Sequence, residues 1–230
     1  MNNIIDLQNI YKTYPLPIKN QSLSIITDLS LTIEKGKSIS IIGKSGCGKS
    51  TLLQIAASLL KPTKGKIIFN NKDISKLNDK QICKIRNQEM GFIFQNSLLL
   101  EDFSAIENIM MPLLINNINK KKAKERAIYL LKEINLLDRG DHKPSQLSGG
   151  EKQRIALARA LSVNPKVIFA DEPTGSLDEE NANYVEDLLI NLVEKEDVTL
   201  ILVTHNLAFA SKCNKVVKLT HGKINEELSE

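Results

Sequence analysis

The feature that most constrains the fold is a glycine-rich octapeptide, GKSGCGKS, at residues 43–50. It follows the alternating segment 38–42 and precedes an unbroken stretch at 50–60, which predicts a strand, a loop and a helix. The spacing matches G-x-x-x-x-G-K-[ST], in which backbone N–H groups and the start of the helix face phosphate oxygens. Complete spacing in this context favours a nucleotide site over an ordinary glycine-rich turn by roughly twenty to one.

Each residue type in this loop has an expected role. The Lys49 ammonium should reach the β- and γ-phosphates, and the Ser50 hydroxyl should bind Mg²⁺. The candidate nucleotide contacts are the residues of the loop and the one that follows it: Gly43, Lys44, Ser45, Gly46, Cys47, Gly48, Lys49, Ser50 and Thr51.

The second candidate element of the site is a pair of acidic residues after the wholly apolar segment 167–170, and this segment is typical of a central parallel strand. Asp171 and Glu172 come directly after it. Two adjacent carboxylates repel each other, so a purely structural role is unattractive and has roughly one chance in ten given the phosphate loop. We expect Asp171 to lie on the Mg²⁺ side and Glu172 to orient or deprotonate the attacking water.

A second anion-binding helix start is predicted at Ser148. Ser148 and Glu151 form the pattern of a capping box, and the simplest interpretation is a well-capped helix. Gly149 and Gly150, however, remove side chains from the first turn, which suits a phosphate approaching the backbone amides. Because the chain has two such helix starts but a single Lys49, we expect each site to combine two copies of the chain.

Strands and helices alternate along the 230 residues, of which 42% are hydrophobic, so the expected class is α/β with a mostly parallel sheet. No linker or repeat divides the chain, and we expect one domain. Further strands are expected at 29–33, 66–71, 199–203 and 215–219, and further helices at 120–134, 148–163 and 183–194.

Composition excludes several classes of protein. The formal net charge is only +4, and the one basic run, residues 120–126, is expected to be a solvated helix face, so no nucleic-acid partner is predicted. The N-terminus lacks the pattern of a signal peptide. No stretch approaches the roughly 20 apolar residues needed to cross a bilayer, and the most apolar run, 106–118, is interrupted. Three widely spaced cysteines form neither a metal-ligand pattern nor a disulfide framework, which fits a reducing cytosol.

With these motifs in order, the whole chain resembles the ATP-binding subunits of ABC transporters. The run LSGGEKQR at 147–154 is the most specific of them, and it stands beside GKSGCGKS at 43–50 and VIFADEP at 167–173. The resemblance implies a P-loop NTPase with a RecA-like parallel-sheet core, an N-terminal antiparallel β subdomain and a helical subdomain at about 96–160, all within one ATP-binding domain spanning 1–230. It also implies ATP with Mg²⁺, and a head-to-tail homodimer that closes on two ATP molecules.

The resemblance also implies roles for four further residues. Gln95 would sense Mg²⁺ and the attacking water and link the site to the membrane partner. Asp178 would line the dimer interface, and His205 would contact the γ-phosphate. An aromatic side chain would stack on adenine; Tyr14 is our choice and Tyr11 is the alternative.

Within the family, the segments 86–95, 102–108 and 111–115 resemble the ATPases of lipoprotein-releasing systems. That resemblance implies integral membrane permease subunits as partners and a peripheral location on the cytoplasmic face of the bacterial inner membrane. The alternatives are a macrolide-export or cell-division ATPase of the same branch. An ATPase of DNA maintenance or translation is less favoured, because the chain lacks a coiled-coil insertion, zinc-binding cysteines and a second ATPase domain.

Overall fold

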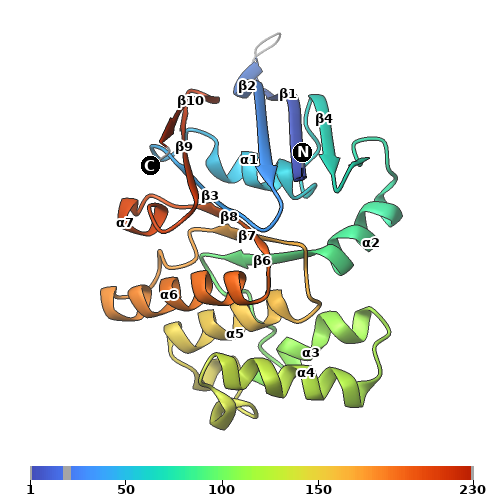
Figure 1. Ribbon diagram of the computed structural model, residues 1–230, viewed down its shortest axis with the longest axis vertical. Coiled ribbons are helices and arrows are strands. Elements are labelled where there is room, and N and C mark those ends of the chain that lie inside the picture. The colour runs from blue at the N-terminus through green and yellow to red at the C-terminus, as the bar shows by residue number, and fades with distance from the viewer. Residues whose placement is uncertain (1, 18–21, 229–230) are drawn as a thin grey trace. The chain divides into compact units, whose positions relative to one another are not determined.

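The computed structural model describes residues 2–17 and 22–228. It divides into two compact units, Met1–Cys83 with Thr199–Glu230, and Lys84–Val198 (Figure 1). The helix α2 (Asp79–Glu89) contains the boundary between them. Each unit contributes its own strands and its own share of the sequence motifs.

The first unit begins with an antiparallel sheet of four strands. β1 (Asn3–Pro15) pairs with β2 (Ser22–Glu34) on one side and with β4 (Lys64–Phe69) on the other, and β5 (Lys72–Asp73) completes the order β2-β1-β4-β5. Alternate residues of β2 are buried and exposed near its end, as expected for a strand with one solvated face. The predicted antiparallel N-terminal subdomain is confirmed.

The same unit contains a mainly parallel group of strands that carries the phosphate loop. β3 (Ser38–Ile42) pairs in parallel with β8 (Thr199–Val203) and β9 (Lys215–Thr220), and β10 (Lys223–Leu228) runs antiparallel to β9. Every residue of β8 is buried, as the apolar pattern predicts. The short helix α7 (Leu207–Ala210) packs against β3.

The helix after the phosphate loop, α1 (Lys49–Ala56), is shorter than the predicted 50–60. Ser58 adopts a left-handed backbone conformation with φ 54°, which ends the helix. The N–H groups of Leu59 and Leu60 then donate to the Gln54 carbonyl oxygen at 2.8 and 3.1 Å. A local backbone turn that no glycine marks therefore ends α1 at Ala56, before the predicted end at residue 60.

The second unit joins two parallel strands to a group of helices. β6 (Met90–Phe94) pairs with β7 (Val167–Asp171), and α5 (Gly149–Leu161) packs against β6 and α6. α3 (Ala105–Ile115) packs against α4 (Lys120–Glu133) and α5. The remaining elements are α6 (Glu179–Lys195) and the short 3₁₀ turns Leu137–Arg139 and Pro144–Gln146. Of these elements, α3, α4, the two 3₁₀ turns and nearly all of α5 lie in the range of about 96–160 where a helical subdomain is expected.

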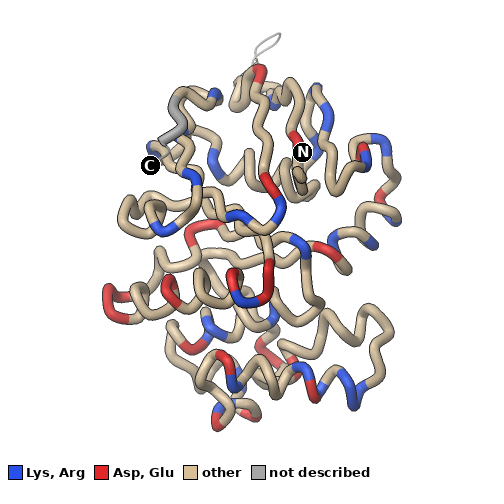
Figure 2. Tube along the Cα trace, in the orientation of Figure 1, with Lys and Arg blue, Asp and Glu red and all other residues tan. Residues whose placement is uncertain are grey.

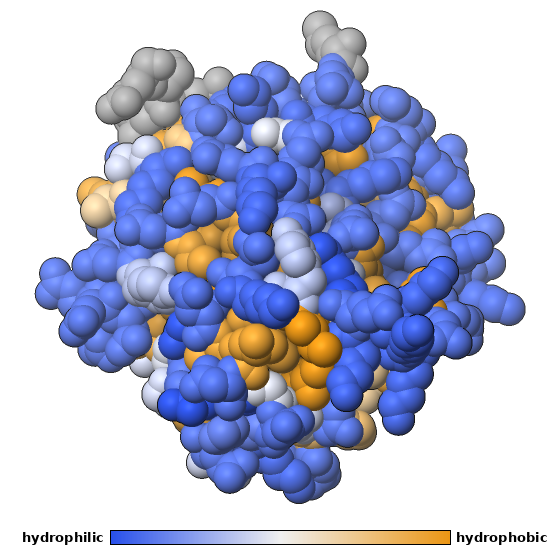
Figure 3. All heavy atoms as spheres, turned by 60° about the horizontal axis from the view of Figure 1, so that its bottom comes forward, coloured by the Kyte–Doolittle hydropathy of each residue, from blue (hydrophilic) through white to orange (hydrophobic). Residues whose placement is uncertain are grey.

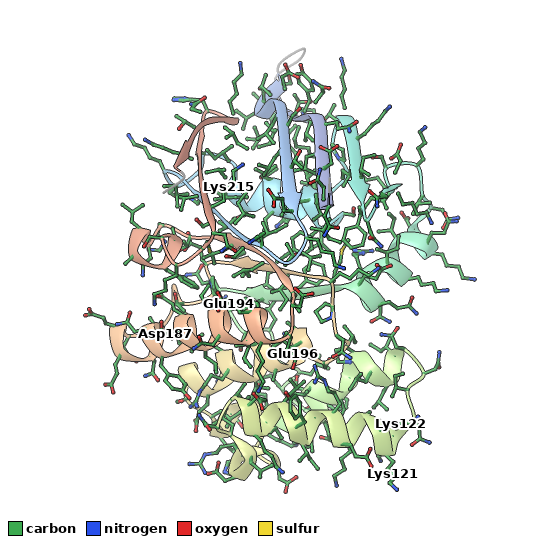
Figure 4. The ribbon with its side chains drawn as sticks, viewed as in Figure 1. Lys121, Lys122, Asp187, Glu194, Glu196 and Lys215 are labelled. Atoms are coloured by element: carbon green, nitrogen blue, oxygen red, sulfur yellow. The ribbon has the colours of Figure 1, made fainter. Side chains whose placement is uncertain are left out.

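The basic run lies at the start of α4 and is visible as a group of basic positions in Figure 2. Lys121 and Lys122 are exposed and point outward from the helix (Figure 4). The buried positions of α4 are Ala123, Ala127, Leu130 and Leu131, so the lysines lie on its solvated part, as predicted. Among the described residues, no helix is both long and apolar enough to cross a bilayer.

Candidate nucleotide site

The phosphate loop connects β3 to α1 in the first unit, as the motif predicts. Gly48 is the N-cap of α1 and contributes no side-chain cap, so backbone N–H groups of the first turn face the loop. Lys49 is 8% exposed, and its ammonium donates to the carbonyl oxygens of Gly43 at 2.9 Å and Lys44 at 3.3 Å. The ammonium and the positive end of the helix are thus concentrated at the loop. Ser50 is exposed and Thr51 is half-buried on the same turn.

Gly43 is required by the close approach of a neighbouring strand. A Cβ atom at this position would lie 2.4 Å from the backbone oxygen of Leu219 in β9 and 2.8 Å from the Cys47 sulfur. The loop therefore passes directly over β9, and a larger residue would displace it from the position in which its N–H groups converge.

The loop opens onto a cavity of about 700 Å³ within the first unit. Residues 43–47 form one wall, and the β9–β10 hairpin forms the other through residues 218–221 and Asn225. Cys47, which is half-buried, is thus part of the loop and of the cavity lining. A cavity of this size is typical of a small-molecule site.

His205 belongs to the same unit and follows β8. In the parallel pair of β3 and β8, Ile41 is opposite Val203. Both strands run in the same direction, so the loop after β3 and His205 after β8 emerge at the same edge. His205 is exposed, and Asn206 next to it caps α7 by accepting from the Phe209 N–H at 3.2 Å. The turn at Asn206 thereby keeps His205 at the strand end.

The two candidate adenine-stacking tyrosines lie on β1 and differ in their surroundings. Tyr11 is half-buried; desolvation first, and then its hydrogen bond to Asp28, raise the pKa of its phenol. Tyr14 is 39% exposed, and the Lys12 ammonium lies 4.9 Å from its ring centroid. Tyr14 pairs with Leu23 of β2, so it lies near the part of β2 that touches the phosphate loop. Of the two rings, that of Tyr14 is the more exposed.

The second unit places Gln95 beside the acidic strand end. Phe94 of β6 is opposite Asp171 of β7 in a parallel pair, so Gln95 and Glu172 leave the two strands side by side. The Ser176 hydroxyl donates to the Gln95 carbonyl oxygen at 3.1 Å. A Cβ atom on Gly175 would lie 3.1 Å from the Gln95 amide nitrogen, so the Gln95 side chain rests on the segment that follows Glu172.

Glu172 adopts a left-handed backbone conformation with φ 47°. For a residue other than glycine this costs about 1–2 kcal/mol. The Gly175 N–H donates to the Glu172 carbonyl oxygen at 3.1 Å, which closes a turn immediately after it. Strained backbone conformations occur most often at functional sites, and the role of the Glu172 carboxylate stays a prediction.

The predicted capping box at the start of α5 is confirmed. The Glu151 N–H donates to the Ser148 hydroxyl at 3.2 Å, and the Ser148 N–H donates to the Glu151 carboxylate at 2.8 Å. That backbone bond, the largest cause, holds the pKa of Glu151 below its ordinary value, and the Arg139 guanidinium at 3.1 Å lowers it further. The capping box thus holds the start of α5 in place. Because the first two residues of the helix are glycines, no bulky side chain covers the backbone N–H groups of this turn.

Packing against another part of the same chain also explains why position 150 is a glycine, and the sequence motif did not reveal this reason. A Cβ atom there would lie 2.7 Å from Oδ1 of Asn181 in α6, and one on Gly149 would lie 3.3 Å from a methyl carbon of Leu177. Asn181 is held in turn by Asp178, the N-cap of α6, whose carboxylate accepts from the Asn181 backbone at 3.0 Å and from its amide at 2.8 Å. These bonds, the backbone one foremost, lower the pKa of Asp178.

Two positioning residues of α5 escaped prediction. Gln153 is 2% exposed and its amide donates to the Phe94 carbonyl oxygen at 2.9 Å, immediately before Gln95. Arg159 donates to the Ser97 and Leu98 carbonyl oxygens at 2.7 and 2.6 Å, and burial lowers its pKa. Polar residues among the apolar positions of a predicted helix were the available signal, but their partners lie about 60 residues away in sequence.

The predicted site residues thus fall into two groups. The first unit carries residues 43–51, His205 and Tyr14, and the second carries Gln95, Asp171, Glu172, Asp178 and the helix start at 148–150.

Comparison with known proteins identifies relatives over nearly the whole chain. A family model described as "ABC transporter" matches residues 26–175. The lipoprotein-releasing system ATP-binding protein LolD of Bdellovibrio bacteriovorus is 43% identical over 94% of this chain and 97% of its own length. The protein of the same name from Legionella pneumophila strain Paris is 45% identical over 97% of this chain and 98% of its own length.

Two solved structures share the fold. The ATP-binding cassette MJ0796, in a dimeric post-hydrolysis state bound to ADP and Pi, superimposes with a TM-score of 0.89 at 35% identity, over 98% of both chains. A second dimeric structure of MJ0796, described as a bacterial ABC transporter cassette, matches with the same score at 36% identity.

Proposed function

This chain belongs to the ABC transporter family, as its ATP-binding and ATP-hydrolysing subunit, and we propose that it powers the release of lipoproteins from the bacterial inner membrane. The observation that carries the ATPase assignment is the complete phosphate loop, whose helix start and buried Lys49 converge on one anion site. The proposed substrate rests on the relatives named LolD, which match 94–97% of the chain at 43–45% identity.

For the chemical step we assign the phosphates of ATP to the backbone amides of residues 43–51 and to the Lys49 ammonium. Glu172 then acts as the general base for the attacking water, and His205 holds the γ-phosphate. Ser50, Gln95 and Asp171 supply hydroxyl, amide and carboxylate oxygens, the hard donors that Mg²⁺ prefers. That ion would neutralise charge on the β- and γ-phosphates when it is bound.

The complete catalytic site is proposed to need a second copy of the chain. Ser148, Gly149 and Gly150 of one copy would contact the γ-phosphate held by the loop of the other, with Asp178 at the interface. The bare first turn of α5 suits an anion, and the solved MJ0796 structures are dimers. Because the Ser148 hydroxyl already caps α5, its contribution to a phosphate would be made from a preorganised position.

The membrane partner is proposed to dock on the segment after Gln95. Leu98, Leu100 and Phe103 are 59%, 43% and 37% exposed, which is unusual for side chains of this size so close together in sequence. Figure 3, which brings the lower side of Figure 1 forward, shows apolar surface exposed among hydrophilic side chains. Arg159 donates hydrogen bonds to two backbone carbonyl oxygens of this segment, which begins directly after Gln95. A displacement of the segment by the membrane partner would therefore be transmitted to Gln95. Docking on integral membrane subunits would place the chain on the cytoplasmic face of the inner membrane.

The proposal is tested by reconstituting the chain in proteoliposomes with the integral membrane subunits of a lipoprotein-releasing system, loaded with a lipid-anchored lipoprotein. ATP should release the lipoprotein with the wild-type chain and not with Glu172→Gln, which should still bind ATP. Release that is equal in both preparations would refute the role of Glu172. Rapid ATP hydrolysis with no lipoprotein release would leave the ATPase in place and refute the substrate.

A further inference from the structure

Helix α6 carries a glutamate among its buried apolar residues. Glu186 is 1% exposed, and the other buried residues of this helix are Val185, Leu189, Leu192 and Val193. Burying a carboxyl group costs free energy unless it is hydrogen-bonded, and an apolar residue of similar volume is often at least as stabilising. Stability alone therefore gives no reason for a glutamate at this position.

The carboxyl group of Glu186 is used to hold a residue of the catalytic segment. The Thr174 hydroxyl donates to Glu186 Oε1 at 3.2 Å, and Thr174 is itself 8% exposed. Thr174 lies two residues after Glu172, in the loop that joins β7 to α6. The bond thus ties the start of this loop to a point two turns inside a long helix, where the backbone is rigid.

The rest of the loop is anchored at two further points. Its end is fixed because Asp178 caps α6, and its middle is fixed by the Ser176 hydroxyl on the Gln95 carbonyl oxygen. Glu172 at its beginning has the left-handed φ of 47°. A strained conformation of this kind persists only where the neighbouring residues hold it, and Thr174 is close enough in the chain to do so.

We propose that Glu186 is a positioning residue for ATP hydrolysis: through Thr174 it maintains the turn that directs the Glu172 carboxylate. The inference rests on the proposed function, because it presumes Glu172 as general base. Glu186 touches neither nucleotide nor water in this role. Its effect is to keep Glu172 within the narrow range of positions from which a proton can be taken efficiently.

A purely structural role for Glu186 makes a different prediction from a positioning role. Glu186→Leu would fit the apolar side of α6, so a structural role predicts a changed Tm and an unchanged kcat. A positioning role predicts a fall in kcat of about 10- to 100-fold, because a displacement of about 1 Å at a reacting group has effects of that size. The KM for ATP should stay within about twofold, since Glu186 contributes nothing to ground-state binding.

The experiment measures steady-state ATP hydrolysis and Tm of the full chain for Glu186→Leu, Glu186→Gln, Thr174→Val and the double variant Glu186→Leu/Thr174→Val. Glu186→Gln keeps an oxygen acceptor and should restore kcat to within about threefold of wild type. Thr174→Val keeps the shape of the side chain but removes the hydroxyl, so its kcat should fall as much as that of Glu186→Leu. In the double variant, kcat should be little lower than in either single variant, because both substitutions remove the same hydrogen bond. Glu194→Leu, an exposed glutamate of the same helix (Figure 4), is the matched control and should keep wild-type turnover.

Wild-type kcat in both Glu186→Leu and Thr174→Val would overturn the proposal, as would additive losses in the double variant. If Glu186→Leu does not fold, Thr174→Val and Glu186→Gln decide the matter alone. Glu172→Gln is measured in the same series. If it is inactive while the Glu186 and Thr174 variants are normal, only the positioning role fails; if it turns over like wild type, the proposed general base fails as well.

Discussion

Replacing Gly150 with alanine should destabilise the protein, although alanine is a better helix former than glycine. The added Cβ would lie 2.7 Å from Asn181 Oδ1, well inside van der Waals contact. The Asn181 side chain cannot simply rotate away, because its amide donates to Asp178 at 2.8 Å. The substitution must therefore both push α5 away from α6 and weaken the cap of α6.

The expected change in the free energy of unfolding combines one stabilising effect with two destabilising ones. Replacing glycine with alanine within a helix stabilises it by about 0.5–1 kcal/mol. Overpacking a fitted contact costs about 1–3 kcal/mol, and weakening an N-cap costs about 1 kcal/mol. We therefore expect a net loss of about 1–3 kcal/mol, and each kcal/mol lowers Tm by about 2–4 °C for a chain of this length.

Gly149→Ala is the matched control for this prediction. Its Cβ would lie 3.3 Å from a terminal methyl carbon of Leu177, which can move, so its Tm should equal or exceed that of wild type. Thermal unfolding followed by circular dichroism and urea unfolding at 25 °C would compare the three proteins without nucleotide. If the Tm of Gly150→Ala is not lower than that of Gly149→Ala, the contact with Asn181 is not the reason for this glycine.

Three further outcomes are expected. Ser148→Arg and Lys49→Ala should each be inactive alone, and mixing them should restore one of the two composite sites and part of the ATPase activity; no recovery at any mixing ratio would count against the two-copy site. A thiol reagent should modify Cys47, with protection by ATP, long before Cys213, whose pKa burial raises to about 11; equal labelling rates would contradict this. The pKa of Glu151 is lowered in the folded state, so its contribution to stability is present above its ordinary value of 4.5 and is lost as the pH falls through the folded value. The difference in urea midpoint between wild type and Glu151→Ala should therefore shrink in acid, and a constant difference would refute the cap.

Local chemistry made several features predictable from the sequence. The phosphate loop, the capping box of Ser148 and Glu151, and the apolar strand before Asp171 each depend on residues within a few positions of one another. The strand β8 was predicted with the bounds that the structure shows, because every one of its residues is buried and all but Thr199 are apolar. The roles assigned to individual site residues remain predictions.

Other elements were missed because distant contacts decide them. Helix α3 was seen only as an interrupted apolar run, since Glu107, Asn108 and Pro112 break its pattern. In the structure Glu107 completes a capping box with Ser104, and Asn108 is fully buried with its amide donating to the carbonyl oxygens of Leu100, Phe103 and Ser104. A buried polar residue whose hydrogen bonds go to a neighbouring loop interrupts the apolar pattern from which a helix is predicted.

The sequence by itself determined the loop between β3 and α1 in which phosphate binding is predicted and the carboxylates that follow the central strand, because those properties arise from backbone geometry over a few consecutive residues. The tertiary structure alone decided how these groups are held. Gln153, Arg159 and Glu186 fix the segments that carry Gln95 and Glu172 through hydrogen bonds to partners 12 to 62 residues away. Such bonds depend on which chain segments the fold brings within about 3 Å, and no local pattern specifies that.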